Sequence, residues 1–137
     1  MSCQIFPDQY DEQLSAKRAR VLTLFPQIIL PLQAYPSSVS GYRMRAEFRV
    51  WHLGGSWDYV MFDPQSRQRI VITDCQMVTD AIRQLMMPLR DLLLADTELS
   101  RRLFAVDFLA STTGEVLVTL IYHRPLDESW DSSALCF

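Results

Sequence analysis

Residues 42–51 read YRMRAEFRVW, and apolar and polar side chains alternate along the whole stretch. Period-two alternation predicts a strand with one face in a core and the other face in water. The apolar face would consist of Met44, Ala46, Phe48 and Val50. The polar face would carry Arg43, Arg45, Glu47, Arg49 and Trp51. Because three arginines and a tryptophan share that face, we predict that it is suited to nucleic acid.

The composition predicts a single folded domain. Of 137 residues, 49% are hydrophobic and 21% are charged, which suits one core and excludes a disordered chain. The net charge of −3 disfavours non-specific nucleic-acid binding but leaves room for a local basic face. No apolar run approaches the ~18 residues of a membrane span, and the first residues lack the pattern of a signal peptide. We therefore expect a cytoplasmic protein with no membrane partner.

Periodicity and turn signals divide the chain into a first helix, a connector and a meander. We predict a helix from Pro7 to about Leu24, capped by Asp8 or Asp11. Prolines at positions 26, 31 and 36 then favour an irregular connector. Three antiparallel strands would follow over residues 41–72, with a tight turn at the two glycines 54–55.

The second half of the chain predicts more helix and two more strands. Helical spacing of apolar residues runs over residues 75–95, with a kink or a break between two helices at Pro88. A short helix capped by Asp96 or Thr97 comes next, followed by strands over residues 104–110 and 116–122. The order of elements predicts an α+β fold, an antiparallel sheet of about five strands with helices packed on one face.

The sequence contains no recognisable catalytic or metal-binding motif. Cys3, Cys75 and Cys136 are widely spaced without a CxxC pair, so we predict reduced thiols and no metal site. Cys75 would begin the second helix, whose dipole could favour its thiolate, but no general base adjoins it. His52 and His123 each end a strand without a nucleophile beside them. We therefore name no catalytic residue.

Aromatic residues in the predicted sheet add to the nucleic-acid interpretation. Arginine binds phosphate through paired hydrogen bonds, and aromatic rings stack on unpaired bases. The candidate stacking rings are Trp51, Trp57, Tyr59, Phe104 and Tyr122. The alternative is that the aromatics form the core while the arginines pair with Glu47 and Asp58. For Trp57 and Phe62 the core position is the expected one.

Residues 42–52 closely resemble the N-terminal strand of the TrmA-type tRNA (uracil-5-)-methyltransferases, which make the 5-methyluridine of the tRNA T-loop. The resemblance continues at QYDEQL (9–14) with Lys17, at FDPQ (62–65), at IRQLM (82–86), at LFAVDFL (103–109) and at LIYHRPLDESW (120–130). It covers about residues 5–130. The resemblance implies that residues 1–137 form the N-terminal RNA-binding domain of such an enzyme, with a divergent tail over residues 131–137.

The resemblance also implies roles for single residues. Arg49 would contact the backbone or a base edge of the tRNA T-arm, Phe104 would stack on or wedge against a base, and His123 would hydrogen-bond or stack. Arg43 and Arg45 would support them and are partly structural. In relatives this region holds a refolded loop whose target uridine is flipped out.

Methyl transfer in this family needs three things that the matched region does not supply. They are a cysteine that adds to the uracil ring, a carboxylate base, and a domain that binds S-adenosylmethionine. The resemblance thus implies a tRNA-binding fragment or truncated homologue that holds no cofactor and is inactive alone. The alternative is a standalone interaction or structural protein, which could self-associate through the surface that normally faces the catalytic domain.

Overall fold

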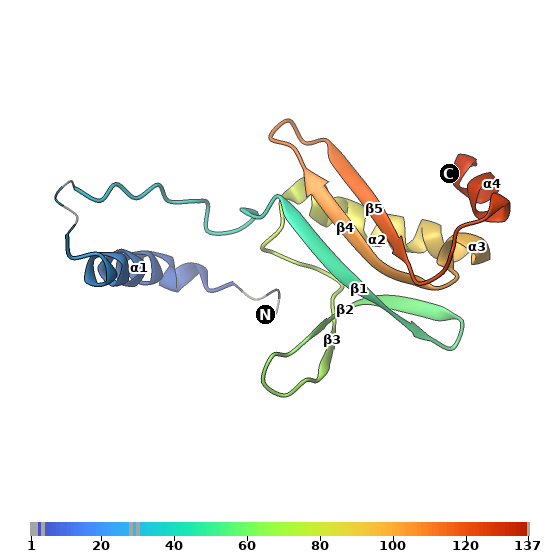
Figure 1. Cartoon of the computed structure of the whole chain (residues 1–137), viewed down its shortest axis with the longest axis horizontal. Coiled ribbons are helices and arrows are strands. Elements are labelled where there is room, and N and C mark those ends of the chain that lie inside the picture. Colours follow the sequence, from blue (N-terminus) through green and yellow to red (C-terminus); the bar gives the residue numbers. More distant parts are fainter. Residues whose placement is uncertain (1–2, 4, 28, 30, 137) are drawn as a thin grey trace.

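A computed structural model describes residues 3, 5–27, 29 and 31–136, and the structural statements below concern those residues. Five antiparallel strands form one sheet in the order β3-β2-β1-β4-β5 (Figure 1). The strands are β1 (Arg45–Leu53), β2 (Ser56–Phe62), β3 (Arg69–Val71), β4 (Leu103–Ala110) and β5 (Val116–Tyr122). The strand that carries the arginines is therefore the central one.

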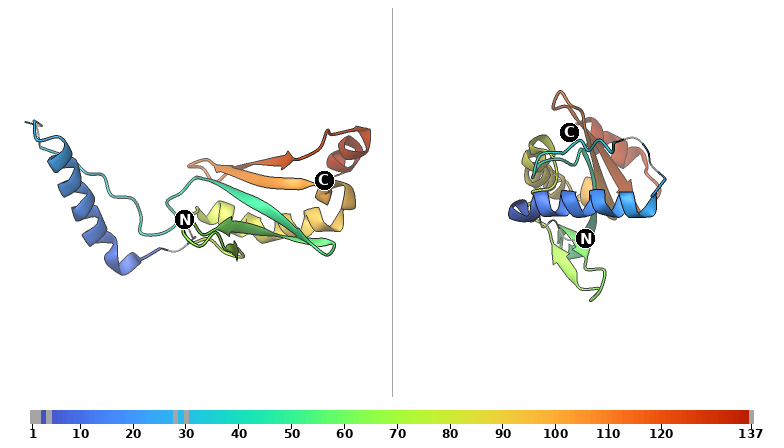
Figure 2. Two further views of the ribbon diagram at one scale, coloured as in Figure 1. Left: turned by 60° about the horizontal axis from the view of Figure 1, so that its bottom comes forward. Right: turned by 90° about the vertical axis from the view of Figure 1, so that its left-hand side faces the viewer.

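Helix α2 (Asp80–Ala95) runs along one face of the sheet, and α3 (Thr97–Ser100) and α4 (Glu128–Leu135) lie at one end of it (Figures 1 and 2). No helix in the described chain covers the opposite face, which we call the outer face. The predicted α+β class with helices on one side is thus confirmed.

The core lies between the inner face of the sheet and α2. Phe48 is fully buried, and its ring packs against Tyr59 at 5.6 Å and Phe108 at 6.1 Å between centroids. From α2, Ile82 and Met86 face these rings and are fully buried as well. Edge and tilted contacts between aromatic rings stabilise such a core beyond the apolar area that they bury.

The alternation predicted for the arginine strand is present. Phe48 and Val50 are buried, whereas Arg45, Glu47 and Arg49 are exposed. The hairpin from β1 to β2 turns at Gly54 and Gly55, with φ of 57° and 86°. Both glycines adopt the left-handed conformation that a two-residue hairpin turn needs, so this turn prediction is confirmed.

Helix α2 begins later than predicted and does not break. It starts at Asp80, so Cys75 precedes it by five residues and is not at its N-terminus. The helix continues through Pro88, which is exposed, as is Gln84. Because both residues lie on the solvent side, water can satisfy the Gln84 carbonyl that Pro88 leaves without an amide partner.

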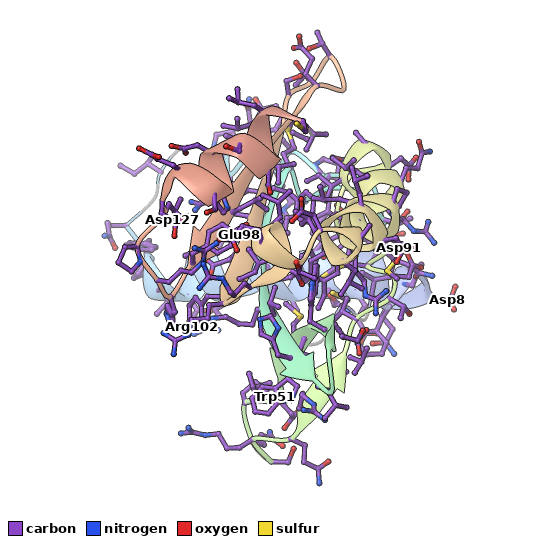
Figure 3. The ribbon with its side chains drawn as sticks, turned by 90° about the vertical axis from the view of Figure 1, so that its right-hand side faces the viewer. Asp8, Trp51, Asp91, Glu98, Arg102 and Asp127 are labelled. Carbon is purple, nitrogen blue, oxygen red and sulfur yellow. The ribbon has the colours of Figure 1, made fainter. Side chains whose placement is uncertain are left out.

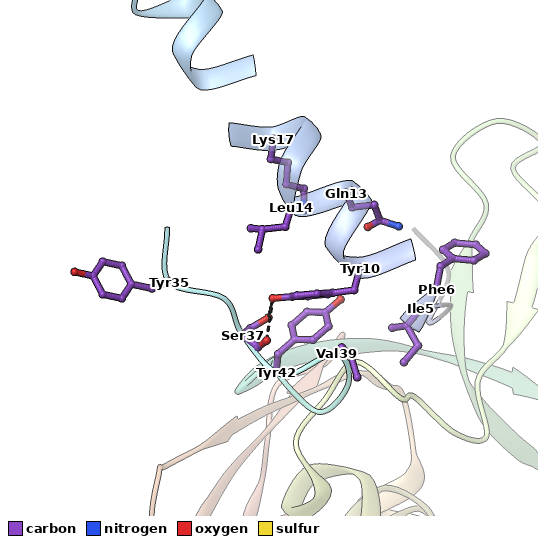
Figure 4. A pocket seen from close by; sticks show the side chains of 10 residues that line it. All are labelled: Ile5, Phe6, Tyr10, Gln13, Leu14, Lys17, Tyr35, Ser37, Val39 and Tyr42. Atoms are coloured by element: carbon purple, nitrogen blue, oxygen red, sulfur yellow. Dashed lines mark hydrogen bonds between the residues drawn. The ribbon is translucent and has the colours of Figure 1, made fainter. Parts of the chain in front are cut away.

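The first helix is shorter than predicted and is uncapped. Residues Pro7–Gln9 form a 3-10 turn, η1, and α1 runs over Tyr10–Leu24 with no side-chain cap. None of the residues of α1 is buried, and the helix stands away from the sheet (Figures 1 and 2). The hydroxyl of Tyr10 donates to the Ser37 carbonyl at 2.8 Å and ties α1 to the connector (Figure 4).

Replacing Phe48 with alanine tests which face of the sheet is the core. We expect a loss of about 3–5 kcal/mol in the free energy of unfolding, because the substitution empties a fully buried site. Urea denaturation followed by circular dichroism measures it. The matched control is Leu117→Ala on the outer face, which is 64% exposed and should change the free energy by less than about 0.5 kcal/mol. Equal losses from the two variants would contradict this assignment of faces.

Candidate nucleic-acid interface

Three side chains from three adjacent strands form one stack on the outer face. The guanidinium carbon of Arg49, on β1, lies 4.0 Å from the centroid of the Phe104 ring on β4. The Phe104 ring in turn lies 3.5 Å from the ring of His123, just past β5, at an interplanar angle of 19°. The structure therefore brings together three of the residues that the sequence singled out.

A β-bulge directs Phe104 into this stack. From Ala110 back to Val106, alternate residues of β4 face the core, and continued alternation would turn Phe104 inward. The register with β5 shifts between Leu103 and Ala105, so Phe104 is the extra residue of the bulge. A bulge re-aims a side chain in this way, and Phe104 consequently shares the outer face with Ala105, the partner of Arg49.

Arg124 anchors the turn that carries His123. Its side chain is 5% exposed, and its guanidinium donates to the carbonyl of Arg101 at 3.1 Å and to a carboxylate oxygen of Glu98 at 2.6 Å. The His123 amide donates to the carbonyl of Arg102 at 3.1 Å. These contacts hold His123 against the end of α3, and Figure 3 shows Glu98, Arg102 and Asp127 gathered at this end.

Arg102 lies beside the stack in a strained backbone conformation. Its φ is 56°, a left-handed value that residues other than glycine rarely adopt. Its exposed side chain lines a hollow of about 430 Å³ together with Phe104 and His123. Strain of this kind is often found at functional sites, and Arg102 adds a cation to the rim.

A second aromatic group extends the outer face toward β3. Trp51 and Phe62 meet edge to face at 6.2 Å, and the guanidinium of Arg69 lies 4.7 Å from the centre of the Trp51 ring. Between this group and the first stack is a hollow of about 400 Å³, lined by Arg49 and Phe104 on one side and by Trp51 and Phe62 on the other. The two groups thus face a common space.

The other predicted arginines are engaged differently. Arg45 forms a salt bridge with Asp107 at 2.9 Å, and the hydrogen bonds to that carboxylate raise the pKa of Arg45. Arg49, which stacks on Phe104, is 3.9 Å from a carboxylate oxygen of Glu47. Asp58, the other acid considered as a partner, pairs instead with Arg90 of α2 at 2.9 Å. Of the two arginines in β1, Arg49 therefore has the longer distance to its acidic neighbour.

Arg43 lies apart from Arg45 and Arg49. It precedes β1 and forms a parallel bridge with Val78. Its backbone amide donates to the Met77 carbonyl at 2.8 Å, and its carbonyl accepts from the Thr79 amide at 3.0 Å, so Arg43 fixes the segment that precedes α2.

Cys75 is a core residue. Only 1% of its surface is exposed. A hydrogen bond with Cys3 lowers the pKa of Cys75 to about 6, although burial of the thiol acts in the opposite direction, and hydrogen bonds from the amides of Met77 and Val78 lower it further. The predicted influence of the α2 dipole is wrong, because that helix begins at Asp80.

Several aromatic residues occupy positions other than those predicted. Trp57 is buried as expected, but Tyr59, a candidate stacking ring, is also in the core, where its hydroxyl donates to the Met86 carbonyl at 3.1 Å. Tyr122 is half-buried and donates to the Leu99 carbonyl. Phe62 was expected in the core and is exposed instead. Phe62 is four residues from Asp58 along β2, and alternation puts both side chains on the same face of the strand. This spacing is the sequence signal for an outer-face position of Phe62.

The described chain shows neither a metal centre nor a membrane span. In its described part, no three His, Cys, Asp or Glu side chains gather in a way that could hold a metal ion. No helix among the described residues is long and apolar enough to cross a bilayer.

Comparison with known proteins identifies the family. The family model described as tRNA (Uracil-5-)-methyltransferase matches residues 9–136. The chain belongs to this family. Its relatives include tRNA/tmRNA (uracil-C(5))-methyltransferases from Chromohalobacter salexigens, 45% identical, and Idiomarina loihiensis, 42% identical. The matches cover 93% and 96% of this chain but only 36% of each relative, so the chain spans about a third of their length.

The match to the methyltransferase family includes the stack and the C-terminal helix. Arg49, Phe104 and His123 all fall within residues 9–136. The segment from Asp131 onward, expected to diverge, lies in α4 as far as Leu135, with Asp127 as the cap that accepts from the Trp130 amide.

The anchor of this methyltransferase-family site should weaken in acid. Hydrogen bonds from Arg101 and then Arg124 lower the pKa of Glu98 below its ordinary 4.5. A carboxylate with a lowered pKa stabilises the fold above its unfolded pKa, and that contribution is lost as pH falls through the folded pKa. Glu98→Gln should therefore lower the thermal midpoint at pH 7, and the difference from the native chain should shrink below about pH 4.5.

Thermal unfolding followed by circular dichroism between pH 7 and pH 3 measures this effect. Glu12→Gln on exposed α1 is the matched control and should leave the midpoint unchanged. A deficit for Glu98→Gln that stays constant down to pH 3 would contradict the role given to the carboxylate.

Proposed function

We propose that the outer face of the sheet binds the T-arm of tRNA, as the recognition domain of a tRNA (uracil-5-)-methyltransferase that makes 5-methyluridine in the T-loop. The stack of Arg49, Phe104 and His123 on an uncovered sheet face is the observation that carries the proposal. The names of the relatives, which give tRNA and tmRNA as substrates, support RNA as the ligand.

The stack suits an unpaired base beside a phosphate. Aromatic rings on a sheet are the usual platforms for unstacked bases, and arginine adds charge as well as a planar surface. A duplex alone keeps its bases stacked on one another, so this site favours a loop. The T-arm offers such a loop on a short stem, and a methyltransferase that acts on C5 of uracil must extrude its target base from the stack.

Arg45 has a supporting part in this proposal. Its bidentate contact with Asp107 bridges β1 and β4 beside the stack, at 2.9–3.3 Å. Arg43 supports the segment that leads into β1. Neither guanidinium is placed in the stack itself.

The proposal gives this chain recognition and no chemical step. S-adenosylmethionine supplies the methyl group when it is bound to the complete enzyme, and we assign its binding to parts of the relatives that this chain does not match. Cys75 fits a structural role better than that of a nucleophile, because a thiol buried in the core cannot reach a uracil ring. The proposal places the domain in the cytoplasm, where its RNA ligand is found.

Binding of a T-arm hairpin RNA tests the proposal. Fluorescence anisotropy at several salt concentrations should show an affinity that falls as salt rises, because phosphate contacts release counterions. Phe104→Ala should weaken binding roughly 5- to 150-fold, the equivalent of about 1–3 kcal/mol for one stacked base. Arg49→Ala should weaken it and also reduce the salt slope.

Lys17→Ala on α1 is the matched control for the loss of one cation away from the outer face, and its affinity should equal that of the native chain. A duplex with the same stem and no loop should bind more weakly than the hairpin. Absence of binding by the native chain at high protein concentration would refute the proposal.

Purified chain incubated with labelled S-adenosylmethionine and unmodified tRNA should transfer no methyl group. The reason is that the proposal assigns neither the catalytic nucleophile nor a cofactor site to this chain. Scintillation counting of the recovered tRNA measures the product, with a complete family member as the positive control. Transfer above background by the chain alone would overturn the assignment of recognition without chemistry.

A second candidate is an interaction protein that self-associates. Exposed apolar side chains on α1 and the connector favour it, among them Ile29, which is 98% exposed, and Tyr35. A hollow of about 320 Å³ between α1 and the connector, shown in Figure 4, adds to this surface. Sedimentation velocity of the samples used for RNA binding separates the candidates, since a dimer that binds no hairpin favours self-association.

A further inference from the structure

Trp51 and Phe62 are the feature of the outer face that the first stack leaves unexplained. Both side chains are 44% exposed, although large aromatic rings are normally buried in folded domains. They come from neighbouring strands, β1 and β2, and meet edge to face. Figure 3 shows Trp51 on the hairpin formed by these strands.

The core does not need these two rings. The aromatic cluster of Phe48, Tyr59 and Phe108 fills the inner face of the sheet. On the outer face, Trp51 and Phe62 line the same hollow as Val60, which is 1% exposed. Any apolar side chain would cover a valine, so burial of Val60 does not account for an exposed indole with a guanidinium placed over its ring.

Arg69 gives the group the same chemistry as the first stack. Its guanidinium lies over the Trp51 ring, as that of Arg49 lies over Phe104. Each group therefore combines an aromatic ring on the outer face with a cation from another strand of the sheet. The hollow between them is lined mainly by apolar side chains and, at about 400 Å³, lies in the range of roughly 300–1,000 Å³ typical of ligand sites.

We propose that Trp51, supported by Phe62 and Arg69, is a second stacking platform that holds another unpaired base of the RNA bound by the first stack. This inference rests on the proposed function and adds a requirement to it. The ligand must present two unpaired bases to the outer face at once, with the intervening backbone near Arg49 and the hollow.

The sheet geometry limits how those two bases are arranged. Trp51 on β1 and Phe104 on β4 both line the hollow of about 400 Å³, which lies between the two platforms. Bases stacked directly on one another are only about 3.4 Å apart. Because this hollow separates the platforms, the two bases are not stacked directly on one another, and the outer face selects a splayed loop over an ordered single strand.

Tryptophan fluorescence of the whole chain, titrated with the T-arm hairpin, tests the platform directly. Stacking of a base on Trp51 should quench its emission, whereas Trp57 is buried and Trp130 is half-buried in α4, where it packs edge to face on Tyr122. Trp51→Leu should abolish most of the quenching and weaken binding roughly 5- to 150-fold, as measured by anisotropy. Trp51→Phe retains a ring, so it should lose the quenching but recover most of the affinity.

Leu53→Ala is the matched control, because Leu53 is exposed on the same hairpin but does not line the hollow. It should leave both affinity and quenching unchanged. Arg69→Gln should weaken binding less than Trp51→Leu and reduce the salt slope. Circular dichroism confirms that each variant is folded before it is titrated.

The outcomes separate this inference from the proposed function. If the native chain binds and Phe104→Ala weakens binding while Trp51→Leu does not, the recognition function stands and the second platform is refuted. If Trp51→Leu and Trp51→Phe lose affinity equally, stacking is refuted as the role of the ring. If the native chain does not bind the hairpin, both fall.

Discussion

Burial of one side of β1 is the constraint on which the rest of the structure depends. Phe48 and Val50 must lie against α2, and the pleat then sends Arg49 and Trp51 to the opposite face. A slip of one residue would expose Phe48 and bury arginine, at a cost of several kcal/mol. The same contacts that hold the fold together therefore set the direction of the two side chains around which both platforms are built.

The central position of β1 makes its outer face the meeting point of the sheet. Strands from both halves of the chain flank it, so Phe104 and His123 approach Arg49 from one side and Phe62 and Arg69 approach Trp51 from the other. Among the described residues, α2, α3 and α4 lie on the inner face and at one end, and α1 stands away from the sheet. The sheet packs on α2 through its inner face and leaves its outer face accessible, which suits recognition of an RNA loop.

Three irregular features of the backbone and turns lie around the stack of Arg49, Phe104 and His123. A bulge turns Phe104 outward. Arg102, whose φ is positive, connects α3 to β4. Arg124 fixes the turn after β5. Each of these departs from the most regular form of its element, and together they converge on His123 and Phe104. Departures from regularity that gather at one place indicate a functional constraint more strongly than any one of them alone.

Much of the fold and part of the site followed from the sequence by itself. Alternation defined the faces of β1, glycines defined its turn, and the resemblance singled out Arg49, Phe104 and His123, because all of these are local patterns. Only the tertiary structure decided that those three form one stack, since β1, β4 and β5 meet through long-range pairing. It also decided that Arg43 lies apart, that Phe62 is exposed, and that Cys75 is core. Arg69 and Arg102 had no local signal, because their roles come from the strands and turns that surround them.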